Sequence, residues 1–229
     1  MIVIMGGTSG IGLESAKYLS TNNYNVLIAG RNNKSNSNIK YKYIDVTDEN
    51  SVKDFFNNID VLDGLIYSAG ITTSKKSIEE FDTEIFDDIM DVNVKGLMLC
   101  LKYAYRLLKK SKARIVVVNS LAARTYSQFS GIEYTISKTA LSGVVKHLSV
   151  EFAEDNILIN SIFPSMTQTP MLVQNTNKEF LQEVEKDIPL GRIAQPDEIA
   201  KAIEFLISDK NTYMSGCGLD LNGGQFLNG

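Results

Sequence analysis

The sequence contains little of the residue types on which several common chemistries depend. Its single histidine, His147, excludes a zinc site with several histidines and argues against a histidine-based triad, so we interpret it as structural. Two cysteines, Cys100 and Cys217, are too few for a disulfide framework and lack the spacing of metal ligands. We expect both to be buried free thiols, as free cysteines usually are.

Long hydrophobic runs and an excess of positive charge are also absent. No apolar run reaches the ~18–20 residues that a membrane span needs. A net charge of −4 provides no basic field for nucleic acid or for an anionic membrane. Ile2–Met5 runs directly into glycines, without the basic flank or cleavage site of a signal peptide. We therefore expect a cytoplasmic protein with no nucleic-acid or membrane partner.

Short β-branched runs alternate along the chain with longer stretches of helical period. The predicted strands are Ile2–Met5, Asn25–Ala29, Lys40–Asp45, Leu62–Ser68, Arg114–Asn119, Leu158–Phe163 and Leu219–Asn222. The predicted helices are Leu13–Ser20, Ser51–Asn58, Phe81–Lys109, Tyr134–Glu154 and one that begins at Pro196. Such alternation is typical of a parallel sheet with helices on both faces. With no repeat or linker, the chain is predicted to be one α/β domain, a doubly wound parallel sheet of about seven strands.

Two segments interrupt this alternation. The polar stretch Asn32–Asn38 is predicted to be a loop. Ser165–Gln195 is long and contains Pro170, Pro189 and Gly191. Because loops of that length in compact domains are commonly lids or binding loops, we expect this segment to cover a substrate.

The first predicted strand leads into a glycine-rich loop, Gly6–Gly12, that opens a helix. A strand, glycine loop and helix in this order let backbone N–H groups approach a pyrophosphate, and the positive end of the helix dipole adds to the attraction. The spacing is G-x-x-x-G-x-G, unlike the common dinucleotide fingerprint, and a purely structural turn is the alternative. Position in the first strand–helix unit favours a Rossmann-type nucleotide site.

The end of the second predicted strand bears on the choice of nucleotide. NAD-binding domains usually place an acidic residue there for the ribose 2′-hydroxyl, whereas this chain has Gly30 followed by Arg31. A guanidinium can bind a 2′-phosphate that a carboxylate would repel. The alternative is a solvated loop arginine, and Ser9 supplies no second positive charge. NADP(H) is favoured over NAD(H).

A tyrosine and a lysine lie four residues apart at the start of a long predicted helix. Tyr134 and Lys138 therefore share a helix face. The phenol of a free tyrosine has a pKa near ~10, and a neighbouring ammonium is expected to lower it. Ser120 ends a predicted central strand, at the edge where open sheets bind ligands, and its hydroxyl could hold a substrate oxygen. Y-x-x-x-K alone is common by chance in helices, so its weight comes from the accompanying residues.

Taken together, Gly6–Gly12, Ser120 and the Tyr134/Lys138 pair resemble the classical short-chain dehydrogenase/reductase family across essentially the whole chain. The stretch Leu190–Ala200 resembles 3-oxoacyl-carrier-protein reductases in particular, and Asn222–Gly224 resembles the family's last strand and turn. The resemblance implies a catalytic tetrad of Asn93, Ser120, Tyr134 and Lys138. It implies cofactor contacts from Gly6, Thr8, Ser9, Gly10, Ile11, Gly12, Arg31, Asp45, Val46, Ser68, Ala69, Gly70, Tyr134, Lys138, Pro164, Thr167 and Thr169, and no metal.

Three residues depart from the family pattern. Met5 replaces the threonine that usually opens the glycine motif, and Ser68 replaces the asparagine of Asn-Ala-Gly. These two changes affect structural hydrogen bonds near the cofactor. Ser165 replaces the glycine after Pro164 and narrows the backbone conformations available beside the nicotinamide.

The resemblance implies an NADP(H)-dependent oxidoreductase that moves a hydride between the nicotinamide and a small carbonyl or alcohol. Tyr134 would be the general acid/base, Lys138 would hold the ribose and lower the tyrosine pKa, and Asn93 would keep a relay water in place. The alternatives are an NAD(H)-linked sugar, sterol or polyol dehydrogenase and a non-catalytic NADP(H)-binding regulator. The resemblance also implies a homotetramer or homodimer, with Phe81–Lys109, Tyr134–Glu154 and the last strand at interfaces.

Overall fold

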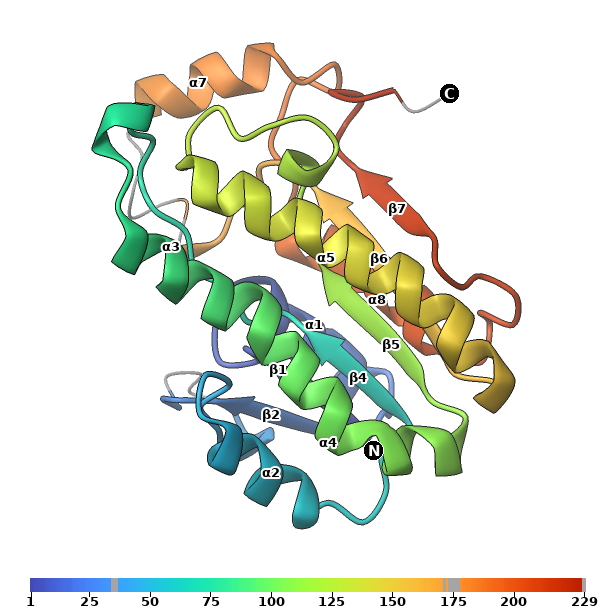
Figure 1. Ribbon diagram of the computed structural model, residues 1–229. Helices are drawn as coiled ribbons and strands as arrows, with labels where there is room; N and C mark the ends of the chain where they lie inside the picture. The colour runs from blue at the N-terminus through green and yellow to red at the C-terminus, as the bar shows by residue number, and fades with distance from the viewer. Residues whose placement is uncertain (34–36, 171, 173–177, 228–229) are drawn as a thin grey trace.

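The computed structural model describes residues 1–33, 37–170, 172 and 178–227. One parallel sheet of seven strands, in the order β3-β2-β1-β4-β5-β6-β7, runs through the molecule (Figure 1). The strands are β1 Ile2–Met5, β2 Val26–Gly30, β3 Lys40–Tyr43, β4 Gly64–Tyr67, β5 Arg114–Val118, β6 Leu158–Pro164 and β7 Gly218–Leu221. The predicted fold class and strand number are confirmed.

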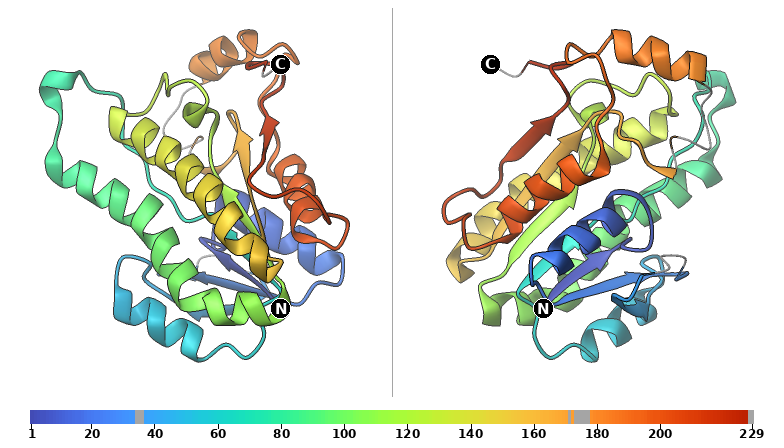
Figure 2. Two further views of the ribbon diagram at one scale, coloured as in Figure 1. Left: turned by 45° about the vertical axis from the view of Figure 1, so that its right-hand side comes forward. Right: turned by 180° about the vertical axis from the view of Figure 1, so that it is seen from behind.

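Helices cover both faces of the sheet, because the side chains of the central strands are apolar on both sides. Ile2 and Ile4 of β1 pack in the cluster that contains α1 and α8, whereas Val3 and Met5 pack in the cluster of α2, α4 and α5. The view from behind shows α1 and α8 lying across that face (Figure 2). The helices are α1 Gly10–Thr21, α2 Glu49–Asn57, α3 Thr83–Met90, α4 Gly96–Ser111, α5 Ile132–Glu151, α7 Lys178–Lys186 and α8 Pro196–Ile207.

The strand order places a ligand crevice between β1 and β4. From β1 the chain builds outward to β2 and β3, and it then returns to the other side of β1 to build β4 through β7. In open parallel sheets, ligands bind outside the carboxyl ends of the strands at such a reversal. The residues that follow β1, β4, β5 and β6 therefore meet at one edge.

Two predicted helices differ from those observed. The stretch Phe81–Lys109 is not one helix: it divides into α3 and α4 around a π-helical turn at Asp91–Lys95. The stretch Tyr134–Glu154 begins earlier, at Ile132, and its end is a 3₁₀ turn over Phe152–Asp155. A continuous apolar stripe predicts a helix. It does not show at which turn the helix takes up one extra residue and becomes π-helical.

The predicted loop Ser165–Gln195 contains a helix, α7, so its description as loop throughout is wrong. Phe180, Val184 and Ile188 recur every four residues and form a small apolar cluster with Met166 and Ile193. This cluster is separate from the two that cover the sheet. Residues 171 and 173–177 of this segment, and 34–36 of the predicted loop Asn32–Asn38, lie outside the described residues.

The two cysteines differ in environment. Cys100 is buried in α4, as expected, but Cys217 is exposed just before the edge strand β7, so the expectation of two buried thiols is half wrong. In the described ranges, no helix is both long and apolar enough to cross a bilayer. The same ranges contain no group of three or more side chains suited to hold a metal ion.

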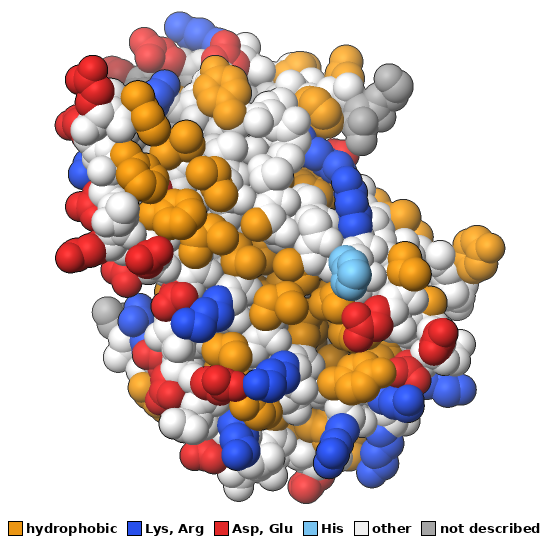
Figure 3. Space-filling model, in the orientation of Figure 1, with side chains coloured by type: hydrophobic (Ala, Val, Ile, Leu, Met, Phe, Trp, Pro, Cys, Tyr) orange, Lys and Arg blue, Asp and Glu red, His pale blue; other side chains and the backbone are white. Residues whose placement is uncertain are grey.

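The outer face of α3, α4 and α5 exposes several large apolar side chains. Figure 3 shows them as a band of hydrophobic atoms that crosses this face. The exposed large apolar side chains of α4 and α5 include Met98, Ile132, Ile136 and Val150, the last of which is 76% exposed. An apolar band of this kind marks a surface suited to contact with another protein.

Candidate active site

The glycine loop after β1 is too tightly folded to accommodate side chains. A Cβ on Gly12 would lie 2.3 Å from the Gly6 carbonyl oxygen, and one on Gly6 would lie 2.6 Å from the Ala69 nitrogen. Gly6 and Gly10 have φ values of +75° and +54°, which favour glycine. Ser9 is the N-cap of α1 but makes no side-chain capping bond, so the first N–H groups of this helix face the crevice without that acceptor. The loop is shaped to receive an anion.

The end of β2 supplies a cation beside this loop. Gly30 lies against Thr8, whose Oγ1 would be 3.3 Å from a Cβ at Gly30. Arg31 is exposed, and within the described part of the chain its side chain has no hydrogen bond or ion pair. Its guanidinium is therefore available to a ligand.

The end of β3 is closed by a turn. The Asp45 Oδ1 atom accepts hydrogen bonds from the Thr47 backbone nitrogen at 3.0 Å and from its Oγ1 at 2.8 Å. Val46 is buried, and a Cβ on Gly96 would come within 2.9 Å of it. Oδ1 of Asp45 is thus occupied locally.

The end of β4 connects the glycine loop to the polar cluster beneath it. The Ser68 nitrogen donates to the Met5 carbonyl at 2.9 Å, and Ala69 contacts Gly6. A Cβ on Gly70 would lie 3.4 Å from Asn93 Oδ1 and 3.6 Å from Lys138 Nζ. The two departures at this edge, Met5 and Ser68, keep the strand pairing because they take part through backbone atoms.

Asn93 is completely buried in the π-helical turn. Its Oδ1 accepts from the Ile71 nitrogen at 2.8 Å, and its Nδ2 donates to the Ile71 carbonyl at 3.0 Å and to Ser137 Oγ at 2.9 Å. The Ser137 hydroxyl in turn donates to the Tyr134 carbonyl at 2.8 Å. The carboxamide therefore ties the end of β4 to α5.

The π-helical turn is stabilised from the neighbouring strand. The buried Tyr67 hydroxyl donates to the Val92 carbonyl, a group of the irregular turn. A Cβ on Gly96 would lie 2.4 Å from the Tyr67 oxygen, so glycine is needed where α4 begins. The irregular turn that carries Asn93 is thus held to strand β4 by the Tyr67 side chain.

Tyr134, Ser120 and Lys138 meet at the carboxyl end of β5. Tyr134 and Ser120 both border one cavity, and Ser120 lowers the pKa of the Tyr134 phenol in part. Ser120 is the N-cap of a 3₁₀ turn, Leu121–Ala123, and its Oγ accepts from the Ala122 nitrogen at 3.1 Å. Lys138 is 5% exposed, its Nζ donates to the Val118 carbonyl at 3.0 Å, and it lies 5.6 Å from the centre of the Tyr134 ring.

Burial controls the titration of this pair. It raises the pKa of Tyr134 above its usual value, although Ser120 lowers it in part. Burial also lowers the pKa of Lys138 to about 8. Burial and Ser120 are the causes that act on the Tyr134 pKa in this structure, and the lowering expected from Lys138 stays a prediction.

The segment after β6 lies over the glycine loop. Pro164 ends the strand, the Ser165 nitrogen donates to the Leu221 carbonyl at 3.0 Å, and Thr167 Oγ1 donates to the Ser165 carbonyl at 3.0 Å. Thr169 faces Gly10, where a Cβ would come within 3.7 Å of its methyl group. Ser165 is not among the residues with positive φ, so its backbone does not require the glycine usual in the family.

A cavity of about 950 Å³ opens beside Ser120 and Tyr134. It begins at Ile11, Pro164, Thr167 and Thr169, next to the glycine loop. Its outer walls come from the segment after β4, the loop before α5, and the α7 region. These walls are lined by Thr72, Thr73, Ser74, Lys75, Thr125, Tyr126, Ser127, Gln128, Phe129, Ser130, Met166, Leu172, Phe180 and Gln225. The site has room for a substrate next to a nucleotide.

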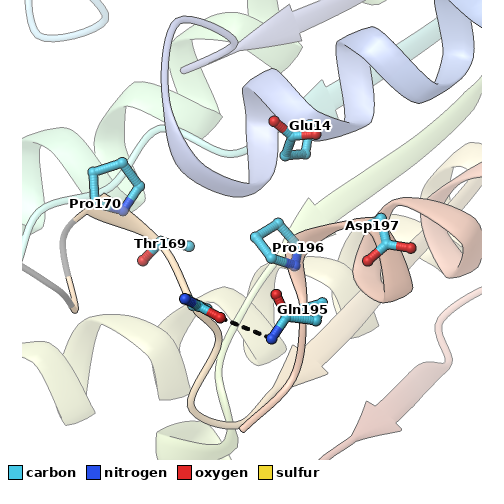
Figure 4. A pocket seen from close by; sticks show the side chains of 7 residues that line it. Glu14, Thr169, Pro170, Gln195, Pro196 and Asp197 are labelled. Carbon is cyan, nitrogen blue, oxygen red and sulfur yellow. Dashed lines mark hydrogen bonds between the residues drawn. The ribbon is translucent and has the colours of Figure 1, made fainter. Parts of the chain in front are cut away.

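A second hollow, of about 650 Å³, lies between α1 and the start of α8 (Figure 4). Its carboxylates are already paired on their own helices, Glu14 with Lys17 and Asp197 with Lys201. Gln195 donates to Gln168 across its floor at 2.8 Å. Neither Ser120 nor Tyr134 lines this hollow, so the chemistry belongs to the larger cavity.

The structure brings together most of the residues predicted from the sequence, and it adds others. Asn93, Ser120, Tyr134 and Lys138 converge, whereas Asp45 and Arg31 lie at the outer strands β3 and β2. Ser137 was missed, because a serine inside a helix gives no signal of its partners. Of the cavity walls, the sequence indicated the Ser165–Gln195 segment, which supplies Met166 and Phe180. The walls from residues 72–75 and 125–130 were missed, because these loops are distant in sequence from the rest of the site.

Comparison with known proteins supports the resemblance to the short-chain dehydrogenase/reductase family. Residues 6–225 match a family model described as enoyl-(acyl carrier protein) reductase. A 3α-hydroxysteroid dehydrogenase from Mediterraneibacter gnavus is 30% identical, over 96% of this chain and 94% of its own. The structure of ElxO with NADP bound has 28% identity and a TM-score of 0.89, covering 98% and 97% of the two chains.

A further solved structure is that of 3-ketoacyl-(acyl-carrier-protein) reductase from Brucella melitensis complexed with NADH. It has 26% identity and a TM-score of 0.87, covering 98% of this chain and 97% of that one. Sequence, fold and site agree with the resemblance. The chain belongs to the short-chain dehydrogenase/reductase family of NAD(P)-dependent oxidoreductases and is similar to its 3-oxoacyl-carrier-protein reductases.

Proposed function

We propose that this protein is an NADP(H)-dependent reductase of small carbonyl compounds, with Tyr134 as the general acid/base. The observation that carries the proposal is that Tyr134 and Ser120 line the same cavity, with Lys138 on the same helix face as Tyr134. A carbonyl oxygen between the two hydroxyls would receive a proton from the phenol. Ser120 would orient that oxygen, and its hydrogen bond would strengthen as negative charge develops.

The residues present fit a dinucleotide. The Gly6–Gly12 loop admits a pyrophosphate because any Cβ at Gly6 or Gly12 would clash with neighbouring backbone, and the start of α1 offers N–H donors. Thr169 and Thr167 lie next to the loop on the nicotinamide side. When bound, the nucleotide supplies the hydride.

The protonation state of the site favours reduction. A phenol whose pKa is raised by burial stays protonated at neutral pH and is ready to donate. Lys138, with a pKa near 8, is largely charged at neutral pH and can hold a ribose hydroxyl. We assign Asn93 a positioning role, because its carboxamide joins Ile71 and Ser137 beside the lysine; a relay water there completes this hypothesis.

The preference for NADP(H) rests on the end of β2. Arg31 is exposed, lacks a partner in the described chain, and follows a strand end without an acidic residue. Of the two nucleotide complexes compared above, one contains NADP and the other NADH, so the preference depends on this chain's own residues. A non-catalytic regulator is disfavoured, because all four residues of the tetrad are kept and lie together.

We also propose that copies of this chain associate as a dimer or tetramer through the apolar band on α3, α4 and α5. Met98, Ile136 and Val150 would be covered in that contact. Sedimentation equilibrium at micromolar concentration should give two or four times the chain mass of 25.4 kDa. A monomer at that concentration would contradict the association.

Tyr134→Phe tests the catalytic proposal. The variant keeps the ring and loses the proton donor, so turnover should fall by about 10²–10⁴-fold while NADPH affinity, measured by fluorescence titration, stays unchanged. Tyr213→Phe, at a tyrosine that is 97% exposed, is the matched control and should keep wild-type turnover. Wild-type turnover in Tyr134→Phe would exclude this acid/base role.

A further inference from the structure

The walls of the cavity beside Tyr134 carry charge of one sign. Among the described residues that line it, Lys75 is the one charged side chain, and no aspartate or glutamate is present. The remaining lining residues carry hydroxyl, amide or apolar side chains. Lys75 has no carboxylate within ion-pair distance in the described chain. The cavity therefore has a positive charge that forms no ion pair within the described residues.

The backbone around Lys75 is fixed relative to the reacting end of the cavity. Ser74 and Ser130 form an antiparallel bridge, and the Lys75 nitrogen donates to the Phe129 carbonyl at 3.2 Å. The Gly131 nitrogen donates to the Thr73 carbonyl at 3.3 Å. Gly131 is the N-cap of the helix that carries Tyr134. The strand that carries Lys75 is thus attached directly to the start of α5.

The nearest buried acid lies behind this wall and does not serve Lys75. Glu133 is 4% exposed, and its Oε2 would contact a Cβ on Gly131. It belongs to the first turn of α5, where the helix dipole stabilises a carboxylate. Glu133 is not among the residues that line the cavity, and its Oε2 has no hydrogen-bond partner.

Apolar side chains line other parts of the cavity. The rings of Phe129 and Phe180 meet edge to face with centroids 4.7 Å apart, which closes the space between the loop before α5 and α7. Met166 and Leu172 also line the cavity and pack against the small cluster of α7. A ligand in the cavity meets these apolar side chains and, among the described lining residues, a single cation, Lys75.

We infer that the substrate is a carbonyl compound with an anionic group, a carboxylate or a phosphate, that Lys75 binds. This inference rests on the proposed reductase function and adds the substrate class to it. The carbonyl lies at Ser120 and Tyr134, the carbon chain lies against Phe129 and Phe180, and the anion lies at the ammonium of Lys75. With no carboxylate on the walls, the cavity repels no part of such a substrate.

The test compares ketones that differ in charge, with NADPH as reductant. Acetoacetate carries a carboxylate, acetoacetyl-coenzyme A carries phosphates at a distance, and ethyl acetoacetate is neutral. We expect Lys75→Gln to lower kcat/KM for the preferred anion by about tenfold, as loss of a partly exposed charge pair does, and to leave the ester unchanged. Lys75→Glu should lower it further. The anion that loses most distinguishes a carboxylate from a phosphate.

Lys76→Gln is the matched control, because Lys76 is an adjacent exposed lysine that does not line the cavity. Inhibition gives a readout without turnover of the anion: the Ki of butanoate against ethyl acetoacetate should rise about tenfold in Lys75→Gln and stay constant in Lys76→Gln. Equal effects of Lys75→Gln on charged and neutral ketones would overturn the inference and leave the reductase proposal standing. Failure to bind NADPH or to reduce any of the ketones would contradict the proposed function itself.

Discussion

The buried cluster around Tyr134 and the rim of the site differ in whether their polar side chains are bonded to other atoms of the chain. Asn93, Ser137 and Lys138 are at most 5% exposed, and each is hydrogen bonded to other atoms of the chain. Arg31 and Lys75 are exposed and have no ion pair in the described chain. The interior cluster has its geometry set by the protein, whereas the rim cations are left for ligands. Under the proposed function, chemistry and selectivity therefore reside in separable parts of the molecule.

We expect the largest effect on turnover from removing the buried charge of this cluster, the ammonium of Lys138. Lys138→Met should reduce turnover by about 10²–10⁴-fold. It should also stabilise the protein, because a pKa lowered to about 8 means that burying the charge costs free energy at neutral pH. The free energy of unfolding should rise by about 3 kcal/mol at pH 7, as measured by urea denaturation, because each unit of lowered pKa corresponds to about 1.4 kcal/mol.

The pH dependence of stability gives the sign of this effect. Between the lowered pKa of Lys138, about 8, and the ordinary value of 10.5, the unfolded chain binds more protons than the folded one. Wild-type stability should therefore rise across this window, and the advantage of Lys138→Met should shrink. Lys146→Met, at an exposed position on the same helix, should change neither turnover nor stability. Loss of stability in Lys138→Met would contradict the cost assigned to the buried charge.

The rim can be changed without disturbing the interior, and the expected effect is smaller and specific to one ligand. Arg31→Ala should weaken NADPH binding on the order of 10–100-fold, because a charge-assisted contact with the 2′-phosphate is lost. The affinity for NADH and the thermal stability should not change. Isothermal titration with both nucleotides measures this, with Arg106→Ala at an exposed position of α4 as control. Equal losses for the two nucleotides would refute the role of Arg31 in cofactor choice.

The same division explains how far the sequence predicts the molecule. Apolar runs such as Ile2–Met5 and Arg114–Val118 identify the strands, since a parallel sheet is buried on both faces. Gly6–Gly12 and the spacing of Tyr134 and Lys138 identify the interior site, because both depend on local geometry. Four-residue spacing at Phe180, Val184 and Ile188 also indicates α7, but the prolines around that segment favoured a loop.

Other features depend on contacts that a sequence does not display. The π-helical break between α3 and α4 is stabilised by a hydrogen bond from the Tyr67 hydroxyl to the Val92 carbonyl. These two residues are 25 positions apart in the sequence. The raised pKa of Tyr134 follows from burial of the phenol, which outweighs the lowering by Ser120. The exposure of Cys217 depends on its position beside the edge strand β7. The walls that include Lys75 come from separate loops and become a cavity only in the folded chain.

Because of the π-helical turn Asp91–Lys95, the α3–α4 segment cannot lose or gain a single residue without a change in its packing. A π-helical turn holds one residue more than regular α-helix, and each residue of an α-helix rotates the chain by about 100°. Deleting one residue here would restore a continuous helix and turn the buried side of α4, with Leu97, Cys100 and Leu108, away from the core. It would also withdraw the Asn93 carboxamide from Ile71. The α3–α4 segment should therefore not tolerate the insertions and deletions that a surface helix tolerates.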